Sequence, residues 1–284
     1  MIEIIGVDIG GSNLKAGRVM NGIIEKKSVM PVERNATSNQ VLQDLFYCID
    51  ELITPKTRRI GIGVPAVVDP LEGIVYNVQN IPSWEIVPLK NILMKRYNLP
   101  VFINNDANCF ALGEKIYGKG REYKNFVGLS LGTGIGMGII IKNELYNGVL
   151  CGAGEIGMIS YKDSNIENYA SSFFFTQKFG MTPKELFSLA EQGNIKAINA
   201  FNEYGEHLGE AIKSILYLFA PEAIIIGGSI SKAFAYFKKS LETSLESFAY
   251  QKQIENLKIE ISDKTGSPIL GAAALCFQEL NSKL

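Results

Sequence analysis

The residues Ile103-Asn104-Asn105-Asp106-Ala107-Asn108 mark the point where a predicted strand gives way to a predicted helix. The apolar run 99–103 predicts the strand, and a helical pattern continues to Tyr117. Asp106 is therefore expected at the carboxyl end of a strand, where open α/β sheets bind ligands. Two interpretations follow. The carboxylate can accept a proton from a substrate hydroxyl that neighbouring amides hold, or it can simply cap the helix.

A glycine-rich turn near the N-terminus is expected to join two strands. The segment Asp8-Ile9-Gly10-Gly11-Ser12-Asn13 lies between apolar runs, and Asn21-Gly22 then predicts a hairpin. Because these glycines do not open a helix, the pattern excludes a dinucleotide-binding fingerprint and a P-loop. The backbone N–H groups of such a turn can still cradle phosphate. Asp8 at its mouth could hold a hydrated Mg²⁺.

The same arrangement occurs a second time in the chain. The strand predicted at Phe126–Leu131 leads into Gly132-Thr133-Gly134-Ile135-Gly136-Met137-Gly138. At one constant offset, three residues recur: Gly6, Gly10 and Asn21 match Gly128, Gly132 and Asn143. We infer two related α/β domains that face each other, with two glycine turns clamping one polyphosphate. The alternative is that the second cluster is only a flexible turn, although glycines inside an apolar strand cost backbone entropy without local gain.

Two further glycine clusters carry candidate binding residues. Gly152-Ala153-Gly154-Glu155-Ile156-Gly157-Met158 is centred on a carboxylate, and Glu167 follows shortly after it. Gly227 and Gly228 end an apolar strand and precede a helix. Small residues there would admit a nucleoside against the backbone, or they form a plain strand-to-helix turn. The closing helix has a small-residue face at 271–274, which could pack on the first domain.

Composition and charge exclude several classes of function. The chain has 284 residues, 28 basic and 29 acidic side chains, and a formal net charge of −1. That balance gives no reason to expect a nucleic-acid partner. No apolar run reaches the roughly 20 residues of a membrane helix, and the chain starts directly in a strand, so we expect a cytoplasmic protein with no membrane association.

The cysteines and the single histidine also limit the chemistry. Cys48, Cys109, Cys151 and Cys276 are widely spaced, which predicts neither a disulfide framework nor a zinc ribbon. Buried reduced thiols are the simplest interpretation. His207 lies in the long helix predicted at Ile195–Phe219, and we expect it to be partly exposed on that helix.

These clusters, in this order, resemble the ROK family (repressor, open reading frame, kinase) of the sugar kinase/actin/Hsp70 superfamily. The resemblance runs through essentially the whole chain. It rests on the segments 8–12, 63–65 with Asp69, 105–108, 131–136, 154–157 and 226–228. It implies two related actin-like (RNase H-like) α/β domains flanking an interdomain cleft.

The resemblance also implies a role for each candidate residue. Asp106 would be the general base that takes the proton from a sugar hydroxyl, most often the 6-hydroxyl. Asn105, Glu155 and Glu167 would bind the sugar. The ATP phosphates would lie against Gly10, Gly11, Ser12, Gly132, Thr133 and Gly134, and Gly227 and Gly228 would line the adenosine site. Asp8 would hold Mg²⁺ through water. The domains would be 1–113 with 268–284 for the sugar, and 114–267 for the nucleotide. A homodimer is implied as well.

Two departures from the family pattern bear on the substrate. The family histidine that binds zinc and touches the sugar is Met158 here, and the cysteine-rich zinc loop is replaced by the short segment 160–166. We therefore expect no structural zinc. The family also includes repressors with an N-terminal helix-turn-helix, a module that we do not expect here because the sequence begins with the strand ending at Asp8.

Three hypotheses about function follow. The first is ATP-dependent phosphorylation of a hexose or N-acetylhexosamine. The second is a non-catalytic sugar or nucleotide sensor of the same family, without a DNA-binding module. The third is a kinase with a non-sugar acceptor, such as an acyl or pantothenoyl alcohol. The paired Asn105-Asp106 and the Glu155 cluster favour a polyhydroxylated acceptor, because amides and carboxylates can bond several hydroxyls.

Overall fold

The computed structural model describes residues 2–10, 13–33, 35–78, 80–263 and 266–280, and the structural statements below concern these residues. Contacts divide the chain into two units. Unit 1 comprises 1–122, 138–153 and 263–284, and unit 2 comprises 123–137 and 154–262. The assignment of a sugar domain and a nucleotide domain stays a prediction.

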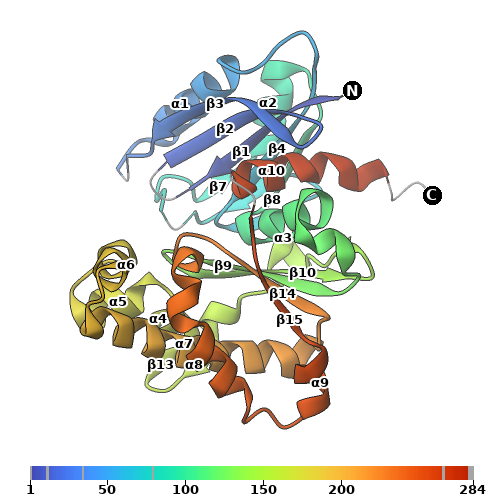
Figure 1. Cartoon of the computed structure of the whole chain (residues 1–284). Helices are drawn as coiled ribbons and strands as arrows, with labels where there is room; N and C mark the ends of the chain where they lie inside the picture. Colours follow the sequence, from blue (N-terminus) through green and yellow to red (C-terminus); the bar gives the residue numbers. More distant parts are fainter. Residues whose placement is uncertain (1, 11–12, 34, 79, 264–265, 281–284) are drawn as a thin grey trace. The chain divides into compact units, whose positions relative to one another are not determined.

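Two five-stranded sheets with the same strand order form the framework (Figure 1). The first has the order β3-β2-β1-β4-β8, and the second has the order β11-β10-β9-β14-β15, with the chain from Gly138 to the end of β11 counted in unit 1. The first sheet contains β1 (Glu3–Ile9), β2 (Asn13–Met20), β3 (Ile23–Pro31), β4 (Thr57–Val64) and β8 (Val101–Asn105). The second contains β9 (Phe126–Leu131), β10 (Ile135–Ile141), β11 (Glu144–Leu145), β14 (Ala223–Gly227) and β15 (Lys258–Ile261).

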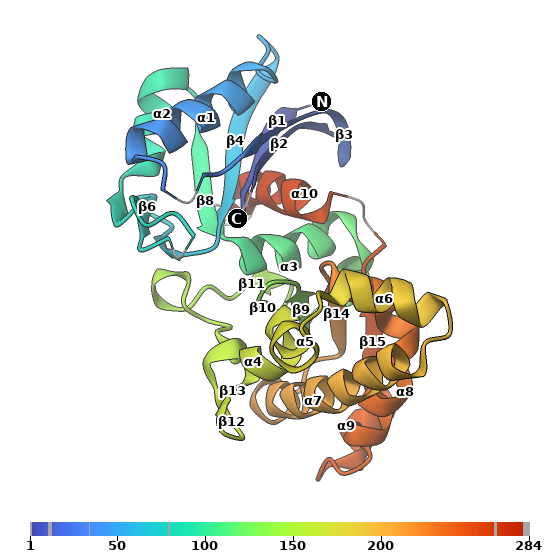
Figure 2. The ribbon, with the colours of Figure 1, turned by 90° about the vertical axis from the view of Figure 1, so that its left-hand side faces the viewer.

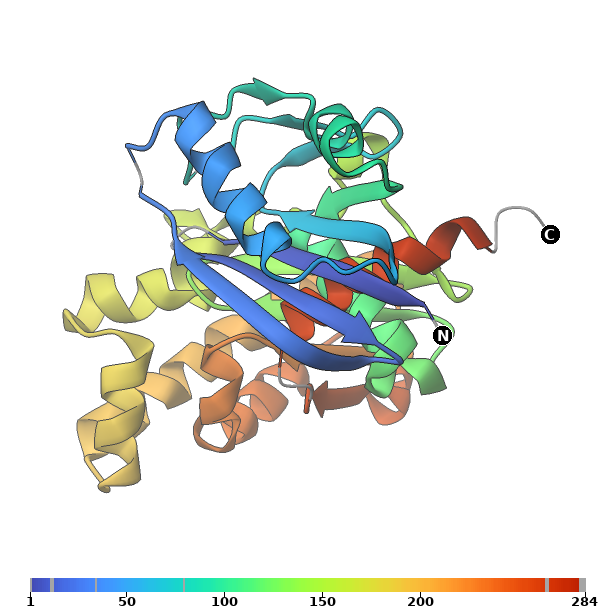
Figure 3. The same ribbon diagram turned by 90° about the horizontal axis from the view of Figure 1, so that it is seen from above.

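The shared strand order confirms the mixed α/β class and the predicted internal repeat. The hairpin turns β2–β3 and β10–β11 occupy the same place in the two sheets. Both central residues of each turn have positive φ: 53° and 76° at Asn21-Gly22, and 52° and 70° at Lys142-Asn143. Such turns match the right-handed twist of the flanking strands. The strands β1–β3 lie side by side in Figure 3. Two smaller sheets were not predicted, one of β5 (Val67–Asp69), β6 (Ile74–Tyr76) and β7 (Ile86–Val87), the other of β12 (Ser160–Tyr161) and β13 (Ser164–Asn165).

Strand β1, at the centre of the first sheet, is buried on both of its faces. Alternate residues of β1 point to opposite sides of the sheet. Ile5, Val7 and Ile9 pack with α1 (Ser38–Asp50) and α2 (Leu89–Tyr97). Ile4 instead packs against α10 (Ser267–Ala274), which contacts α3 (Asp106–Tyr117) (Figure 2).

Helix α10 approaches the sheet closely because glycines face it. A Cβ atom on Gly61 would lie 1.9 Å from the carbonyl oxygen of Ala272, and one on Gly6 would lie 2.2 Å from that of Ile269. No side chain fits at these distances. The predicted packing of the small-residue helix face on the first domain is therefore confirmed.

Unit 2 carries a layer of helices beside its sheet. Helix α7 has the predicted bounds, and it packs along α8 (Figure 1). A capping box of Thr182 and Glu185 begins α6. The helices are α4 (Ile166–Ala170), α5 (Ser172–Phe179), α6 (Pro183–Glu191), α7 (Ile195–Phe219), α8 (Phe234–Leu245) and α9 (Gln251–Asn256). Short 3₁₀ turns are η1 (Lys119–Glu122), η2 (Val149–Cys151), η3 (Ile156–Met158), η4 (Ile230–Ala233) and η5 (Leu275–Leu280).

The predicted state of the cysteines agrees with the structure, in which all four thiols are free and buried. Within the described ranges, none of the helices combines the length and the apolar character that a bilayer span requires.

Candidate functional site

Three neighbouring strands of unit 1 bring polar residues to one edge of the first sheet. Strands β1, β4 and β8 are parallel, with Asp8 opposite Gly63 and Gly63 opposite Asn104. Because parallel strands end at the same edge, Asp8 and the Asn104-Asn105-Asp106 segment share that edge. This is the arrangement that the sequence predicted for the end of β8.

The structure separates the two interpretations of Asp106. The N-cap of α3 is Asn105, whose Oδ1 accepts a hydrogen bond from the Ala107 N–H at 2.9 Å. Asp106 is the first helical residue, and its Oδ1 shares the same N–H at 2.9 Å. The capping role that was considered for Asp106 is thus filled by Asn105. The Asn105 Nδ2 atom donates to the carbonyl of Ala66 at 3.3 Å.

The start of α3 can approach β4 because residue 63 is glycine. A Cβ atom there would lie 3.1 Å from Cys109 Sγ and 3.5 Å from the Asp106 Cα. The first of these distances is already tight. Gly63 therefore helps to fix where Asp106 sits at the sheet edge.

The electrostatics of Asp106 suit a base. Burial, and then the negative charge of Asp8, raise the pKa of its carboxyl, while two backbone hydrogen bonds lower it, and the net result is a pKa of about 6. Burial also raises the pKa of Asp8, while Lys15, whose Nζ lies 3.7 Å from Asp8 Oδ2, lowers it. Two carboxylates close enough to affect each other thus lie at this edge.

The same two carboxylates suit a hard divalent cation better than a soft one. Mg²⁺ is bound through one or two carboxylates, water and substrate phosphates rather than by an all-protein cage. Asp8 offers a buried carboxylate oxygen of this kind. In the part of the chain that the structure describes, no three His, Cys, Asp or Glu side chains gather as metal ligands.

A network of three amides, which sequence reasoning missed, lies behind Asp106. The Asn104 Nδ2 donates to Asn147 Oδ1 at 2.9 Å, and the Asn108 Nδ2 donates to Asn104 Oδ1 at 3.0 Å. Asn104 Oδ1 also accepts the Asn105 N–H at 2.8 Å. The buried Asn108 Oδ1 has no hydrogen-bond partner. The network ties the end of β8 to the loop that contains Asn147, and only the asparagine-rich run at 104–108 hinted at it.

The first glycine turn is described in part. The Gly10 N–H donates to the Asn13 carbonyl at 2.9 Å, which closes the turn between β1 and β2. Gly11 and Ser12, which were predicted to contact phosphate, lie outside the described residues.

The second glycine turn, in unit 2, is braced by the start of α5. The Gly132 N–H donates to the Gly134 carbonyl at 3.0 Å. Ser172 donates its N–H to the Gly132 carbonyl at 2.9 Å and its hydroxyl to the Thr133 carbonyl at 3.2 Å. Ser172 thus holds the turn in place through hydrogen bonds to two of its carbonyl groups.

Glu167 lies against this turn. Its Oε2 accepts the Ile135 N–H at 3.2 Å, and a Cβ atom on Gly134 would lie 2.3 Å from that oxygen. A Cβ atom on Gly157 would lie 3.3 Å from the Glu167 Cβ, so η3 packs beside α4. Glu155 is the exposed residue that begins η3, and Met158 at its end is 52% exposed. The structure therefore brings Gly134, Glu167 and the Glu155 segment together.

Gly227 and Gly228 end β14 next to the end of β9. Gly227 is opposite Ser130 in the parallel register. Gly228 has φ 86°, and a Cβ atom there would lie 2.2 Å from the Leu131 carbonyl oxygen. Only glycine meets both conditions. The two glycine turns of unit 2 thus emerge from adjacent strands at one sheet edge.

The prediction for His207 is wrong, because its side chain is buried. Its Nδ1 lies 3.1 Å from the Tyr161 hydroxyl, and its ring packs edge-on against Tyr161, Tyr169 and Phe174. Burial, and then the charge of Lys162, lower its pKa to about 4 against the opposing effect of Glu203. The β12–β13 hairpin, at the position where the resemblance placed a zinc loop, is therefore held to α7 by aromatic packing.

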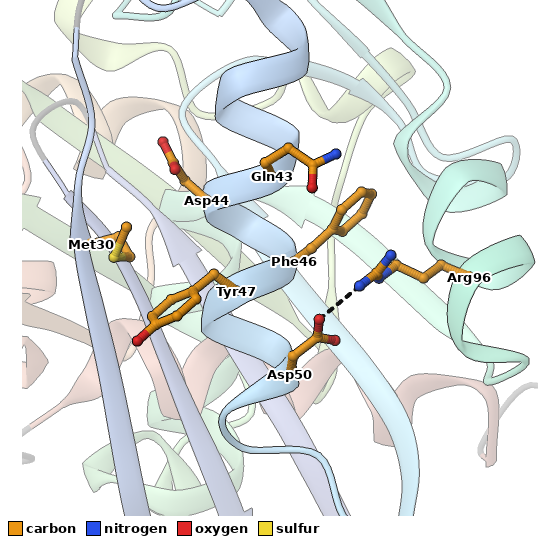
Figure 4. A pocket seen from close by; sticks show the side chains of 7 residues that line it. All are labelled: Met30, Gln43, Asp44, Phe46, Tyr47, Asp50 and Arg96. Atoms are coloured by element: carbon orange, nitrogen blue, oxygen red, sulfur yellow. Dashed lines mark hydrogen bonds and ion pairs between the residues drawn. The ribbon is translucent and has the colours of Figure 1, made fainter.

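A surface hollow of about 360 Å³ in unit 1 contains none of the predicted site residues (Figure 4). In it, the guanidinium of Arg96 pairs with Asp50 at 2.7 Å and lies over the Phe46 ring at 4.4 Å from its centroid. These contacts join α1 to α2. The hollow is lined by Met30, Gln43, Asp44, Phe46, Tyr47, Asp50 and Arg96.

The sequence and the fold of this chain are similar to those of known proteins. A family model described as the ROK family matches residues 4–279. A xylose repressor of Caldicellulosiruptor bescii is 31% identical, covering 99% of this chain and 79% of its own, and a glucokinase of Thermotoga maritima is 33% identical, covering 82% and 83%. The crystal structure of a ROK family glucokinase from Streptomyces griseus, in complex with glucose and AMPPNP, has a TM-score of 0.83 at 26% identity, covering 96% of this chain and 98% of that one. The chain belongs to the ROK family.

Proposed function

We propose that this protein is an ATP-dependent sugar kinase that phosphorylates a hexose or N-acetylhexosamine, at the 6-hydroxyl. The observation that carries the proposal is Asp106, a carboxylate with a pKa of about 6 at the end of β8. A base with such a pKa is ionised at neutral pH and can still accept a proton efficiently. The similarity to glucokinases supports the same activity.

Each candidate residue has one role in this proposal. Asp106 takes the proton from the attacking hydroxyl, which Asn105 helps to orient. Glu155 and Glu167 bond the sugar ring. The glycine turns at Gly10–Ser12 and Gly132–Gly134 hold phosphate through backbone N–H groups, and Gly227 and Gly228 lie against the adenosine.

Nucleotide and metal supply the remaining chemistry. ATP provides the phosphoryl group, and Mg²⁺, held by Asp8 through water, would offset negative charge during transfer. Phosphoryl transfer needs positioning and charge stabilisation more than covalent help from the protein. We further propose a homodimer, on the family resemblance alone.

The second candidate function is a sugar-responsive sensor without catalysis. It is favoured by the similarity to a xylose repressor and by Met158 at the position of the family histidine. A sensor has no use for a base with a raised pKa, which is why the kinase is preferred.

The test is ADP release with MgATP across a panel of hexoses and N-acetylhexosamines. We expect strong turnover with one acceptor or a few. ATP binding without turnover on any acceptor would favour the sensor or an acceptor outside the panel.

A further inference from the structure

The loop Gly148–Gly152 in unit 1 has an unfavourable backbone conformation. Leu150 has φ 52° and Cys151 has φ 58°, although neither is glycine. A non-glycine residue in the left-handed region is disfavoured, especially one that is neither asparagine nor aspartate. Such residues persist where the surrounding structure imposes them, and they concentrate at ligand-binding sites.

The surrounding contacts that impose this conformation lead to the candidate site. The Gly152 N–H donates to Val149 and the Ala153 N–H to Asn147, at 2.9 and 3.1 Å. Asn147 in turn accepts the Asn104 side-chain amide at the end of β8. The loop is thus fixed to the strand that presents Asp106.

The buried side chain of the loop reaches the acceptor-binding residues. Cys151 is 2% exposed, and its thiol lies within hydrogen-bonding reach of the Asn105 backbone. The turn η2 also packs on β5, the strand that begins with Val67. Asn105 and β5 therefore both border this loop.

The exposed side chains of the loop are apolar. Val149 is 85% exposed and Leu150 is 40% exposed, and Val67 on the adjoining strand is 45% exposed. Exposed apolar side chains gain almost nothing from burial on folding. On a strained loop beside a candidate base, these side chains would gain the free energy of burial by covering a bound ligand.

We propose that the Gly148–Gly152 loop determines acceptor specificity, and that Val149 and Leu150 contact an apolar substituent on the sugar. This inference rests on the proposed kinase function. The substituent is an acyl chain on an amino group or an alkyl group on the anomeric oxygen, since both present methyl and methylene groups to the loop.

The test uses the full chain and two homologous series of acceptors. One series is a hexosamine with N-acetyl, N-propanoyl and N-butanoyl groups, and the other is methyl, ethyl and propyl hexosides. Burying a methylene group raises kcat/KM by about threefold to fourfold. We expect such a rise along one of the series.

Matched variants separate the side chains from the backbone strain. Leu150→Asn should abolish the rise in kcat/KM along the series. It should also raise Tm by about 2 °C, because asparagine tolerates positive φ. Val149→Ser should abolish the rise in kcat/KM without raising Tm. Ile23→Ser is the control, since Ile23 is 67% exposed at the start of β3, and it should change neither quantity.

The failures are distinguishable. Two results would overturn the inference and leave the proposed kinase activity intact. In the first, the parent hexoses are phosphorylated but kcat/KM does not rise along either series. In the second, kcat/KM rises along a series as steeply in both loop variants as in the wild type. An unchanged or lower Tm in Leu150→Asn would overturn the argument from strain. No turnover on any acceptor, with ATP bound, would count against the proposed function itself.

Discussion

The side chains of Asn105 and Asp106 share one backbone N–H but differ in their chemistry. Both accept from Ala107, and only Asp106 carries a charge. An amide is enough to cap the helix, so the carboxylate at the next position is not needed for the cap. That difference is the residue-scale reason to assign Asp106 a chemical role.

The pH dependence of turnover should report Asp106. Its pKa is raised to about 6 by burial and by the Asp8 charge, so kcat/KM should fall as the pH drops through about 6, because protonated Asp106 cannot accept a proton. In Asp8→Asn, the residual kcat/KM should fall at a lower pH than in the wild type, because the negative charge that raises the pKa of Asp106 is gone. A kcat/KM that stays constant down to pH 4.5 would contradict the assignment of the base.

His207 should make the folded state sensitive to acid. Its folded pKa of about 4 lies below its ordinary value of 6.5, so between these values the unfolded chain binds a proton that the folded chain does not. The free energy of unfolding should therefore fall as the pH drops through this window, by roughly 3 kcal/mol in total. Above pH 6.5 the effect vanishes.

The check is urea unfolding of the wild type and His207→Asn between pH 7.5 and 4. Carboxylates contribute equally to both proteins, so the difference between the two curves isolates the histidine. Parallel curves across the window would show that the ring is accessible to protons in the folded state.

At the scale of elements, the glycine turns differ in what a side chain would meet. At Gly228 the obstacle is the backbone of Leu131 and the φ is 86°, whereas at Gly134 it is the end of the Glu167 side chain. Gly180 has φ 64° and nothing within 4 Å of an added Cβ, so it isolates conformational strain.

Substituting alanine at these three glycines should lower the free energy of unfolding by amounts that follow these differences. Gly180→Ala should cost about 1 kcal/mol of unfolding free energy, and Gly228→Ala clearly more, because the backbone must also move. Gly134→Ala should cost about 1 kcal/mol through the lost Glu167–Ile135 hydrogen bond, and it alone should raise the KM of the acceptor. Equal costs at Gly180 and Gly228 would mean that the Leu131 contact is unimportant.

Several elements were predictable from the sequence, and others were not. Apolar runs and hairpin residues predicted β9 and α7 with their observed bounds. The strands β5, β6 and β7 are only two or three residues long, too short for a periodic pattern. The buried state of His207 depends on Tyr161 and Tyr169 from a distant hairpin, which no local pattern contains.

The sequence marks where the candidate site residues lie in the fold, but not what supports them. Asp8 lies near the end of a strand, and Asp106 and the glycine turns follow strand ends, as predicted. The Asn104–Asn147 bond and the Ser172 brace join segments far apart in the chain, so only the fold reveals them.

At the scale of the whole molecule, one topology is used twice. Each sheet presents a glycine turn after its first strand, yet only the first sheet places a carboxylate in that strand, because Asp8 is matched by Ser130 in the repeat. The proposed base, Asp106, likewise follows a strand of the first sheet. In the proposed kinase, both sheets would therefore carry a phosphate-binding turn, and the acid–base chemistry would lie in the first sheet's half of the repeat alone.

Turnover and nucleotide binding by Asp106→Asn test the central claim most directly. The amide is nearly the same size as the carboxylate, and Asn105 still caps α3, so the fold should remain. We expect kcat to fall by about 10²–10⁴-fold, while AMPPNP with Mg²⁺ at 100 times its Kd still stabilises the variant by about 2.7 kcal/mol, as it does the wild type. A kcat close to the wild-type value would contradict the account, because the carboxylate would then not be the base.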